Sequence, residues 1–336
     1  MTERAKEIER FIAASGWQYA ERSFLAGDAS FRRYDRLRNG QLSAVLMDAP
    51  PPKEDVRPFV SIANLLRSLG LSAPKVIRKN VEAGLLLLED FGDPTYSRCL
   101  SEGANEFELY KLAVDVLIHL HCAFDSKDAE DIEHYDDSKF LEEAFLFTDW
   151  YLPAVRGIDT TDRERSEFTA LWLSAFSQAR AVPETLVLRD FHVDNLMWLK
   201  NRPSIAACGL LDFQDAVLGP ASYDLVSLFE DARRDVPDAL AIKLLQYYCA
   251  AHPKLDQDCF FASYAVLGAQ RNTKILGIFT RLALRDGKPH YLNNISRVWR
   301  WLEGNLEHPT LAPLREWFEK VVPGDHRVIP SLEKTL

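Results

Sequence analysis

Three polar residues with the chemistry of phosphoryl transfer, Asp190, Asn195 and Asp212, are close in the sequence. Two short apolar runs, 186–188 and 196–199, flank the loop that contains the first two residues. A third apolar run ends directly before Asp212, after a polar segment typical of a turn. This pattern predicts strand, loop, strand, turn and strand, with two candidate residues in the loop and the third at a strand end.

Phosphoryl transfer needs a base that orients and deprotonates the attacking hydroxyl, and oxygen ligands that hold Mg²⁺ against the phosphates. We predict Asp190 as the base, Asn195 as a neutral metal ligand and Asp212 as the charged metal ligand. Acidic residues and asparagine are also common in turns, so the Asp190-to-Asn195 spacing alone is weak. The order of loop, hairpin and Asp-terminated strand makes the combination much more specific.

The preceding chain is predicted to alternate between strands and helices. Alternation at 31–37 and 42–47, joined by Asn39-Gly40, predicts a β-hairpin. Helical spacing of apolar residues predicts helices at 3–14 and 56–69, and the apolar run 84–88 predicts a buried strand.

After residue 95 the pattern becomes strongly helical. Arg271, Asn272 and Lys274 interrupt one apolar helix, which predicts either a cleft lining or one exposed turn. Asp224, close to the start of another helix, is predicted to brace the catalytic loop through backbone hydrogen bonds. The main predicted helices are 140–150, 168–176, 239–251, 260–284 and 295–302.

The composition is that of a globular protein of 336 residues, with 47% apolar and 27% charged residues. The net charge of −10 argues against a nucleic-acid partner. We expect no membrane span and no secretory signal, and the five widely spaced cysteines favour reduced thiols in the cytoplasm. We also expect a monomer.

Longer strings support a resemblance to the aminoglycoside phosphotransferase and choline kinase-like family. Within that family the chain is most similar to bacterial anomeric kinases, which phosphorylate N-acetylmuramate and N-acetylglucosamine at C1 in peptidoglycan recycling. The resemblance extends over roughly residues 20–305. The strings are GDASFRRYDRL at 27–37, MDAPPPKED at 47–55, LLLLEDFGDPTY at 85–96 and LLDFQDAVLGPASYDLVSLFEDARRDV at 210–236.

The resemblance implies an α+β, bilobal protein kinase-like fold that uses ATP and Mg²⁺. It implies a small β-rich nucleotide-binding lobe at 1–90 and a larger, mostly helical catalytic lobe at 91–336. It also implies a phosphate-binding loop and a hinge whose backbone binds adenine, although ordinary turns would have similar sequences. The implied nucleotide-binding residues are Asp28, Ala29, Ser30, Arg32 and Arg33 in the loop, and Glu89, Asp90 and Phe91 in the hinge.

One departure concerns the phosphate-binding cation. Kinases of this fold commonly place a lysine on the third strand, where this sequence has Met47. Arg32, Arg33 or Lys53 is predicted to supply the missing charge, and arginine is the better bidentate partner for phosphate. The sequence does not distinguish among the three.

The candidate substrate-binding residues are Asp215, Arg233 and Arg271. N-acetylmuramate carries a carboxylate, so an arginine is expected near it. The alternatives are a kinase for another small alcohol such as an aminoglycoside or choline, a nucleotide-binding pseudokinase, and a metal-dependent hydrolase. The sequence does not identify the preferred sugar or the residues that bind its N-acetyl or lactyl group.

Overall fold

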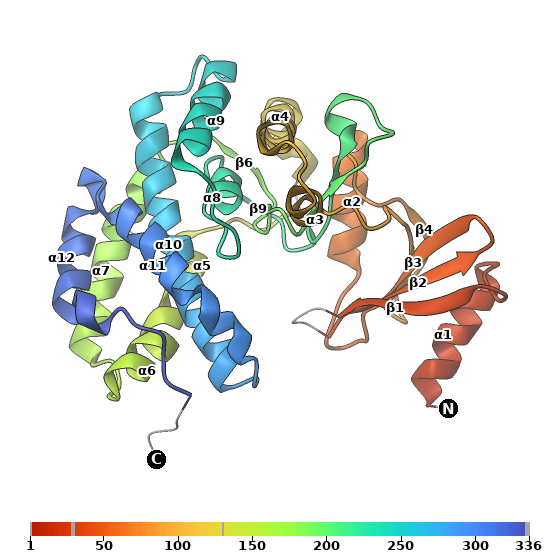
Figure 1. Cartoon of the computed structure of the whole chain (residues 1–336), viewed down its shortest axis with the longest axis horizontal. Coiled ribbons are helices and arrows are strands. Elements are labelled where there is room, and N and C mark those ends of the chain that lie inside the picture. Colours follow the sequence, from red (N-terminus) through yellow and green to blue (C-terminus); the bar gives the residue numbers. More distant parts are fainter. Residues whose placement is uncertain (1, 28–30, 130, 333–336) are drawn as a thin grey trace. The chain divides into compact units, whose positions relative to one another are not determined.

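The computed structural model describes residues 2–27, 31–129 and 131–332 (Figure 1). Tertiary contacts divide the chain into two units. The first unit contains residues 1–116 and 193–216, and the second contains residues 117–192 and 217–336. The predicted catalytic loop therefore crosses from the second unit to the first between His192 and Val193.

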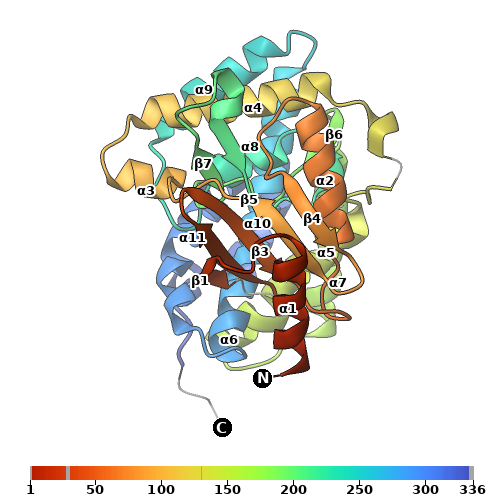
Figure 2. The same ribbon diagram turned by 90° about the vertical axis from the view of Figure 1, so that its right-hand side faces the viewer.

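The first unit contains an antiparallel five-stranded sheet with the order β1-β2-β3-β5-β4 (Figures 1 and 2). Its β2–β3 hairpin turns at Asn39-Gly40, as predicted, and Gly40 has the positive φ of 60° that such a turn requires. The strands are β1 (Glu21–Gly27), β2 (Arg33–Asn39), β3 (Leu42–Asp48), β4 (Val76–Asn80) and β5 (Leu85–Glu89).

Four helices, α1 to α4, and a second hairpin complete the first unit. Ile8 and Ile12 of α1 pack against Leu37, Leu46 and Leu87 on one face of the sheet. The predicted helices at 3–14 and 56–69 are confirmed as α1 and α2. The elements are α1 (Glu3–Ala14), α2 (Arg57–Ser68), α3 (Tyr96–Ser101), the first part of α4 (Glu106–Ala123), β7 (Leu196–Trp198) and β8 (Cys208–Leu210).

The second unit is mostly helical and is organised around the long helix α10 (Gln257–Leu284). Figure 1 shows α10 beside α11 and α5, with which it forms the buried core. A two-stranded sheet of β6 (Glu184–Val187) and β9 (Val217–Pro220) supports the catalytic loop. The other main helices are α5 (Asp137–Leu146), α6 (Leu152–Arg156), α7 (Asp162–Ala179), α8 (Tyr223–Phe229), α9 (Asp238–Ala251), α11 (Ile295–Leu306) and α12 (Ala312–Val321).

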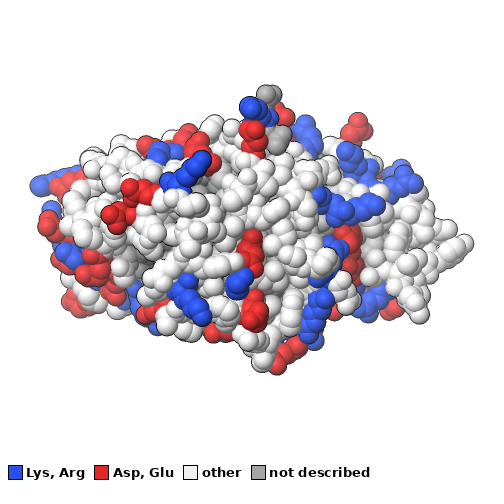
Figure 3. Space-filling view, turned by 90° about the horizontal axis from the view of Figure 1, so that it is seen from above, with Lys and Arg blue, Asp and Glu red and all other residues white. Residues whose placement is uncertain are grey.

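None of the helices in the described ranges is long and apolar enough to cross a membrane. On the face shown in Figure 3, acidic and basic side chains are interspersed.

Close backbone packing between α10 and α5 makes Gly277 a sensitive position. A Cβ added to Gly277 would lie 2.2 Å from the carbonyl carbon of Leu146, so the helix itself would have to move. We expect Gly277→Ala to lower the free energy of unfolding by about 3 kcal/mol. Gly304→Ala is the matched control, because Gly304 lies inside α11 and its added Cβ would meet nothing within 4 Å.

Urea unfolding of the two variants measures this difference. The control should be slightly more stable than the wild type, by about 0.5–1 kcal/mol, because alanine has the higher helix propensity. Equal stabilities for the two variants would show that α10 and α5 can separate at little cost.

Candidate active site

The catalytic loop begins on a rigid backbone in the second unit. The N–H groups of Leu188 and Arg189 donate hydrogen bonds of 2.7 and 2.9 Å to the two carboxylate oxygens of Asp224. Ser227 Oγ donates to the carbonyl of Arg189 at 3.0 Å, and Arg189 has a positive φ of 68°. The prediction that Asp224 braces this loop is confirmed. Burial raises the pKa of Asp224 to about 7, although both N–H donors favour its ionised form.

Asp190 follows directly and is half-buried. Its N–H donates to the carbonyl of Leu188 at 2.8 Å, and its own carbonyl accepts from the N–H of His192 at 3.1 Å. These local bonds form a tight turn that presents Asp190 at the end of the braced segment. A turn of this kind fixes the backbone from which the side chain projects, which a positioned base requires.

A partly buried ion network holds the neighbouring Arg189. The carboxylate of Glu143 on α5 accepts hydrogen bonds from Arg189, from Lys274 at 2.8 Å and from Tyr135. Gln270 adds a bond of 3.2 Å from α10. This cluster ties α5, α10 and the catalytic loop together within the second unit.

The polar interruption of α10 is therefore not an exposed turn. Arg271 and Asn272 are 5% and 0% exposed. The amide of Asn272 donates to the Glu230 carboxylate at 2.6 Å, and the Arg271 guanidinium donates to the Glu230 carbonyl at 3.3 Å. Of the two alternatives, the exposed turn is wrong, because these polar groups find hydrogen-bond partners in the interior.

The Glu143 network predicts a dependence of stability on pH. Burial alone would raise the pKa of Glu143, but Lys274 and Arg189 lower it to about 2, against an ordinary value of 4.5. Because the folded-state pKa is depressed, the stabilisation is complete above pH 4.5 and is lost as the pH falls toward 2. We expect Glu143→Gln to have a lower free energy of unfolding than the wild type at pH 7. This difference in free energy should shrink by about 3 kcal/mol as the pH falls from 4.5 to about 2.

Urea unfolding of both proteins between pH 7 and pH 4 measures the start of this convergence. Comparison with the variant removes the contributions of all other carboxylates, which titrate in both proteins. A difference that stays constant over this pH range would show that the pKa of Glu143 is the same in the folded and the unfolded protein.

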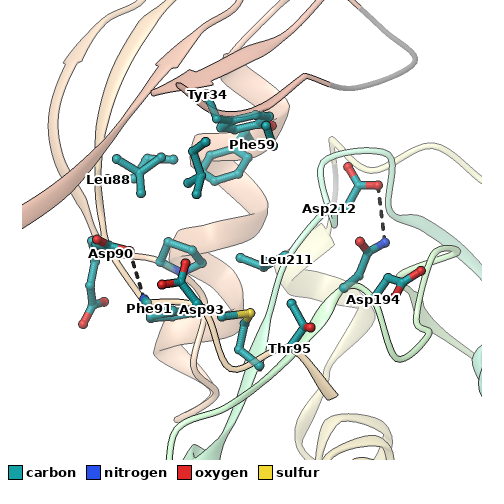
Figure 4. A pocket seen from close by; sticks show the side chains of 18 of the residues that line it. Tyr34, Phe59, Leu88, Asp90, Phe91, Asp93, Thr95, Asp194, Leu211 and Asp212 are labelled. Carbon is teal, nitrogen blue, oxygen red and sulfur yellow. Dashed lines mark hydrogen bonds between the residues drawn. The ribbon is translucent and has the colours of Figure 1, made fainter. Parts of the chain in front are cut away.

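The two candidate metal ligands meet at one end of the β7–β8 hairpin in the first unit. The N–H of Leu211 donates to the Asn195 carbonyl at 3.0 Å, which places the Asn195 and Asp212 side chains together. Asn195 Nδ2 lies 3.4 Å from Asp212 Oδ2, the bond drawn as a dashed line in Figure 4. Gln214 Nε2 donates to Asp212 Oδ1 at 2.9 Å and to Asp215 Oδ2 at 3.0 Å.

This donor set fits Mg²⁺. A carboxylate and an amide oxygen are hard ligands, and magnesium is commonly held by one or two carboxylates together with substrate phosphates and water. Asp212 has a φ of 58°, so its backbone turns sharply where the carboxylate projects. In the described ranges there is no group of three or more His, Cys, Asp or Glu side chains that could hold a metal ion by themselves.

Asn195 and Asp212 also line a pocket of 410 Å³ within the first unit (Figure 4). Its other wall is the segment 89–93, which includes the predicted hinge residues Glu89, Asp90 and Phe91. Four regions distant in the sequence therefore line one cavity: the sheet, helix α2, the predicted hinge and the candidate metal ligands. Its apolar lining includes Val45, Phe59, Leu88, Met197 and Leu211.

Arg36, which the sequence analysis did not select, holds the hinge. Its guanidinium is 2.8 Å from Asp90 Oδ2 and 2.7 Å from Asp93 Oδ1, and it donates to the Gly92 carbonyl at 3.0 Å. Glu89 pairs separately with Arg202 at 2.5 Å. The acidic side chains of the hinge are thus engaged in fixing its backbone. The only signal in the sequence is an arginine inside an otherwise alternating strand, which does not identify its partners.

The remaining candidates are distributed as follows. The Arg32 guanidinium is 3.8 Å from the carboxylate of Asp212, whereas the Arg33 side chain is 55% exposed and pairs with Asp35. Asp28, Ala29 and Ser30 lie outside the described residues.

Arg233 and Arg271 belong to the second unit, together with Asp190 and His192. Burial lowers the pKa of His192; Asp231 and Asp190 oppose this shift, and Arg233 and Arg271 add to it. The charges of Asp190, Asp231, Arg233 and Arg271 therefore all act on the buried imidazole of His192.

Comparisons with known proteins identify a family and several similar kinases. The model of the phosphotransferase enzyme family matches residues 21–257. An N-acetylmuramate/N-acetylglucosamine kinase of Caulobacter vibrioides is 37% identical, with 97% of this chain and 99% of the relative covered. A protein of the same name from Pseudomonas aeruginosa is 36% identical, with 94% of both chains covered.

Solved structures with low sequence identity have the same fold. The GDP complex of an aminoglycoside 2'-phosphotransferase has a TM-score of 0.62 at 15% identity, with 90% of this chain and 98% of that chain covered. A choline kinase from Streptococcus pneumoniae has a TM-score of 0.59 at 12% identity, with 91% and 100% covered. The predicted protein kinase-like fold, with a small antiparallel sheet and a mostly helical remainder, is confirmed. The chain belongs to the phosphotransferase enzyme family.

Proposed function

We propose that this protein is an ATP- and Mg²⁺-dependent kinase that phosphorylates the anomeric hydroxyl of N-acetylmuramate, N-acetylglucosamine or both. The observation that carries the proposal is a set of four relatives named N-acetylmuramate/N-acetylglucosamine kinase. They are 33–37% identical to this chain and match at least 89% of it. Such an enzyme would act in peptidoglycan recycling in the cytoplasm. We expect it to work as a monomer.

In this proposal the pocket of the first unit binds the nucleotide. The adenine would lie between apolar side chains such as Val45 and Leu88 and bond to the backbone of the hinge, which Arg36 holds in place. Asn195 and Asp212 would hold Mg²⁺, which neutralises charge that develops on the transferred phosphoryl group. The phosphate-binding role of residues 28–30 and of Arg33 remains a prediction.

Asp190 is the proposed base. It would orient the C1 hydroxyl and accept its proton as the bond to phosphorus forms. The Asp224 brace and the turn at Asp190 support this role because they fix the backbone that carries the carboxylate before substrate binds. Arg233, Arg271 and Asp215 remain the candidates for sugar binding, and the division into lobes at residues 90 and 91 remains a prediction.

A coupled ADP-release assay tests the function. N-acetylmuramate, N-acetylglucosamine, kanamycin and choline are offered separately with Mg-ATP, and ³¹P NMR identifies the phosphorylated position. We expect turnover with the amino sugars and a phosphate at C1. Turnover with kanamycin or choline but not with the amino sugars would show that the proposed acceptor is wrong. ATP binding without turnover on any acceptor would favour a pseudokinase.

A further inference from the structure

The face of the sheet that lines the nucleotide pocket has no lysine at the expected position on β3. Met47 is paired with Tyr34 on β2 and Leu86 on β5, and it is 1% exposed. Its side chain is neutral and buried in the sheet. A triphosphate in this pocket therefore needs a cation from another element.

Arg32 lies beside the candidate metal ligand. Its side chain, 10% exposed, precedes β2, and its Nη2 atom is 3.8 Å from Asp212 Oδ1. Its Nε atom is 3.9 Å from Glu54 Oε2. Both separations are longer than a hydrogen bond but within the range of an ion pair. The guanidinium is therefore close to the site where the phosphates of a metal-bound nucleotide are expected.

The segment before α2 holds Arg32 in this place. Glu54 Oε1 accepts a hydrogen bond of 2.9 Å from the N–H of Phe31, next to Arg32. The Nζ atom of Lys53 lies 4.0 Å from the centroid of the Phe31 ring. Glu54 thus contacts both the backbone before Arg32 and the guanidinium, and it can orient the arginine through two contacts.

The neighbouring cations are directed elsewhere. Arg33 is 55% exposed and its Nε atom is 3.1 Å from Asp35 Oδ1. The ammonium of Lys53 lies over the Phe31 ring, and Arg36 is engaged by Asp90 and Asp93. Among the described contacts of the three cations that the sequence left open, only those of Arg32 include a proposed metal ligand, Asp212.

We propose that Arg32 binds the phosphates of the nucleotide in place of the strand lysine, and that Glu54 is its positioning residue. This inference rests on the proposed function, since it assumes a nucleoside triphosphate in the pocket. An arginine fork suits two phosphate oxygens, and a charge-assisted bond of this kind is stronger than a neutral one. The ion pair of Arg32 with Glu54 takes the place of the lysine–glutamate pair of other kinases.

Isothermal titration calorimetry with ATP, ADP and adenosine tests the inference without relying on turnover. We expect Arg32→Met to weaken ADP and ATP binding by about 10- to 100-fold and to leave adenosine binding unchanged. Arg32→Lys should recover part of the loss, because the charge is retained but the fork is not. Glu54→Gln should give a smaller loss in the same direction.

Arg38→Met is the matched control, because it removes an exposed arginine from β2 and should bind all three ligands as the wild type does. Thermal unfolding shows whether each variant is folded, and Arg32→Lys remains informative if Arg32→Met is not. Wild-type protein that binds adenosine as tightly as ATP would contradict the proposed function. Wild-type preference for ATP that persists in Arg32→Met and Arg32→Lys would overturn only the role of Arg32.

Discussion

Replacement of Asp190 by asparagine is expected to lower kcat by about 10²- to 10⁴-fold. The amide has nearly the same shape as the carboxylate but cannot accept the proton of the sugar hydroxyl. The backbone of the loop should not change, because Asp224 binds the N–H groups of Leu188 and Arg189 and not the Asp190 side chain. Nucleotide affinity should therefore remain close to that of the wild type.

Steady-state turnover and ADP titration are measured together for this variant. Asp159→Asn provides a control with the same chemical change at an exposed position of the second unit. Wild-type turnover in Asp190→Asn would exclude this carboxylate as the base. A parallel loss of nucleotide binding would indicate that the substitution disturbs more than proton transfer.

Replacement of Asp212 by asparagine is expected to lower kcat by about 10³-fold, because a metal ion typically contributes several kcal/mol of charge stabilisation to phosphoryl transfer. Asp212 is the only charged member of the proposed ligand pair. Both of its oxygens face donors, one from Asn195 and one from Gln214. In the variant, the NH₂ group of the new amide would face one of these N–H donors and could not accept its hydrogen bond. The positions of the two ligand side chains, residues 195 and 212, would therefore also change.

The distinguishing readout is the Mg²⁺ dependence of ATP binding. In the wild type, Mg²⁺ should tighten ATP binding, and in Asp212→Asn this effect should largely disappear while adenosine binding is retained. The same Mg²⁺ titration of Asp190→Asn should resemble the wild type and serves as the control. An unchanged Mg²⁺ dependence in Asp212→Asn would place the metal on other ligands.

The sequence by itself determined the fold class, the order of the catalytic elements and several local structures. The Asn39-Gly40 turn, helix α1 and the strand before Glu89 depend on local turn chemistry and hydrophobic periodicity, which neighbouring residues specify. The sequence also predicted that Asp224 braces the catalytic loop, and its two hydrogen bonds to backbone N–H groups confirm this.

Only the tertiary structure decided which charged residues meet. Arg36 and Asp93 are 57 residues apart, and Glu143 and Lys274 are 131 apart, so no periodic pattern connects them. The same holds for the choice among Arg32, Arg33 and Lys53, which differ little in sequence but point toward Asp212, Asp35 and Phe31 respectively. Periodicity indicates which face of an element is buried, but the partner of a buried charge depends on packing between distant segments.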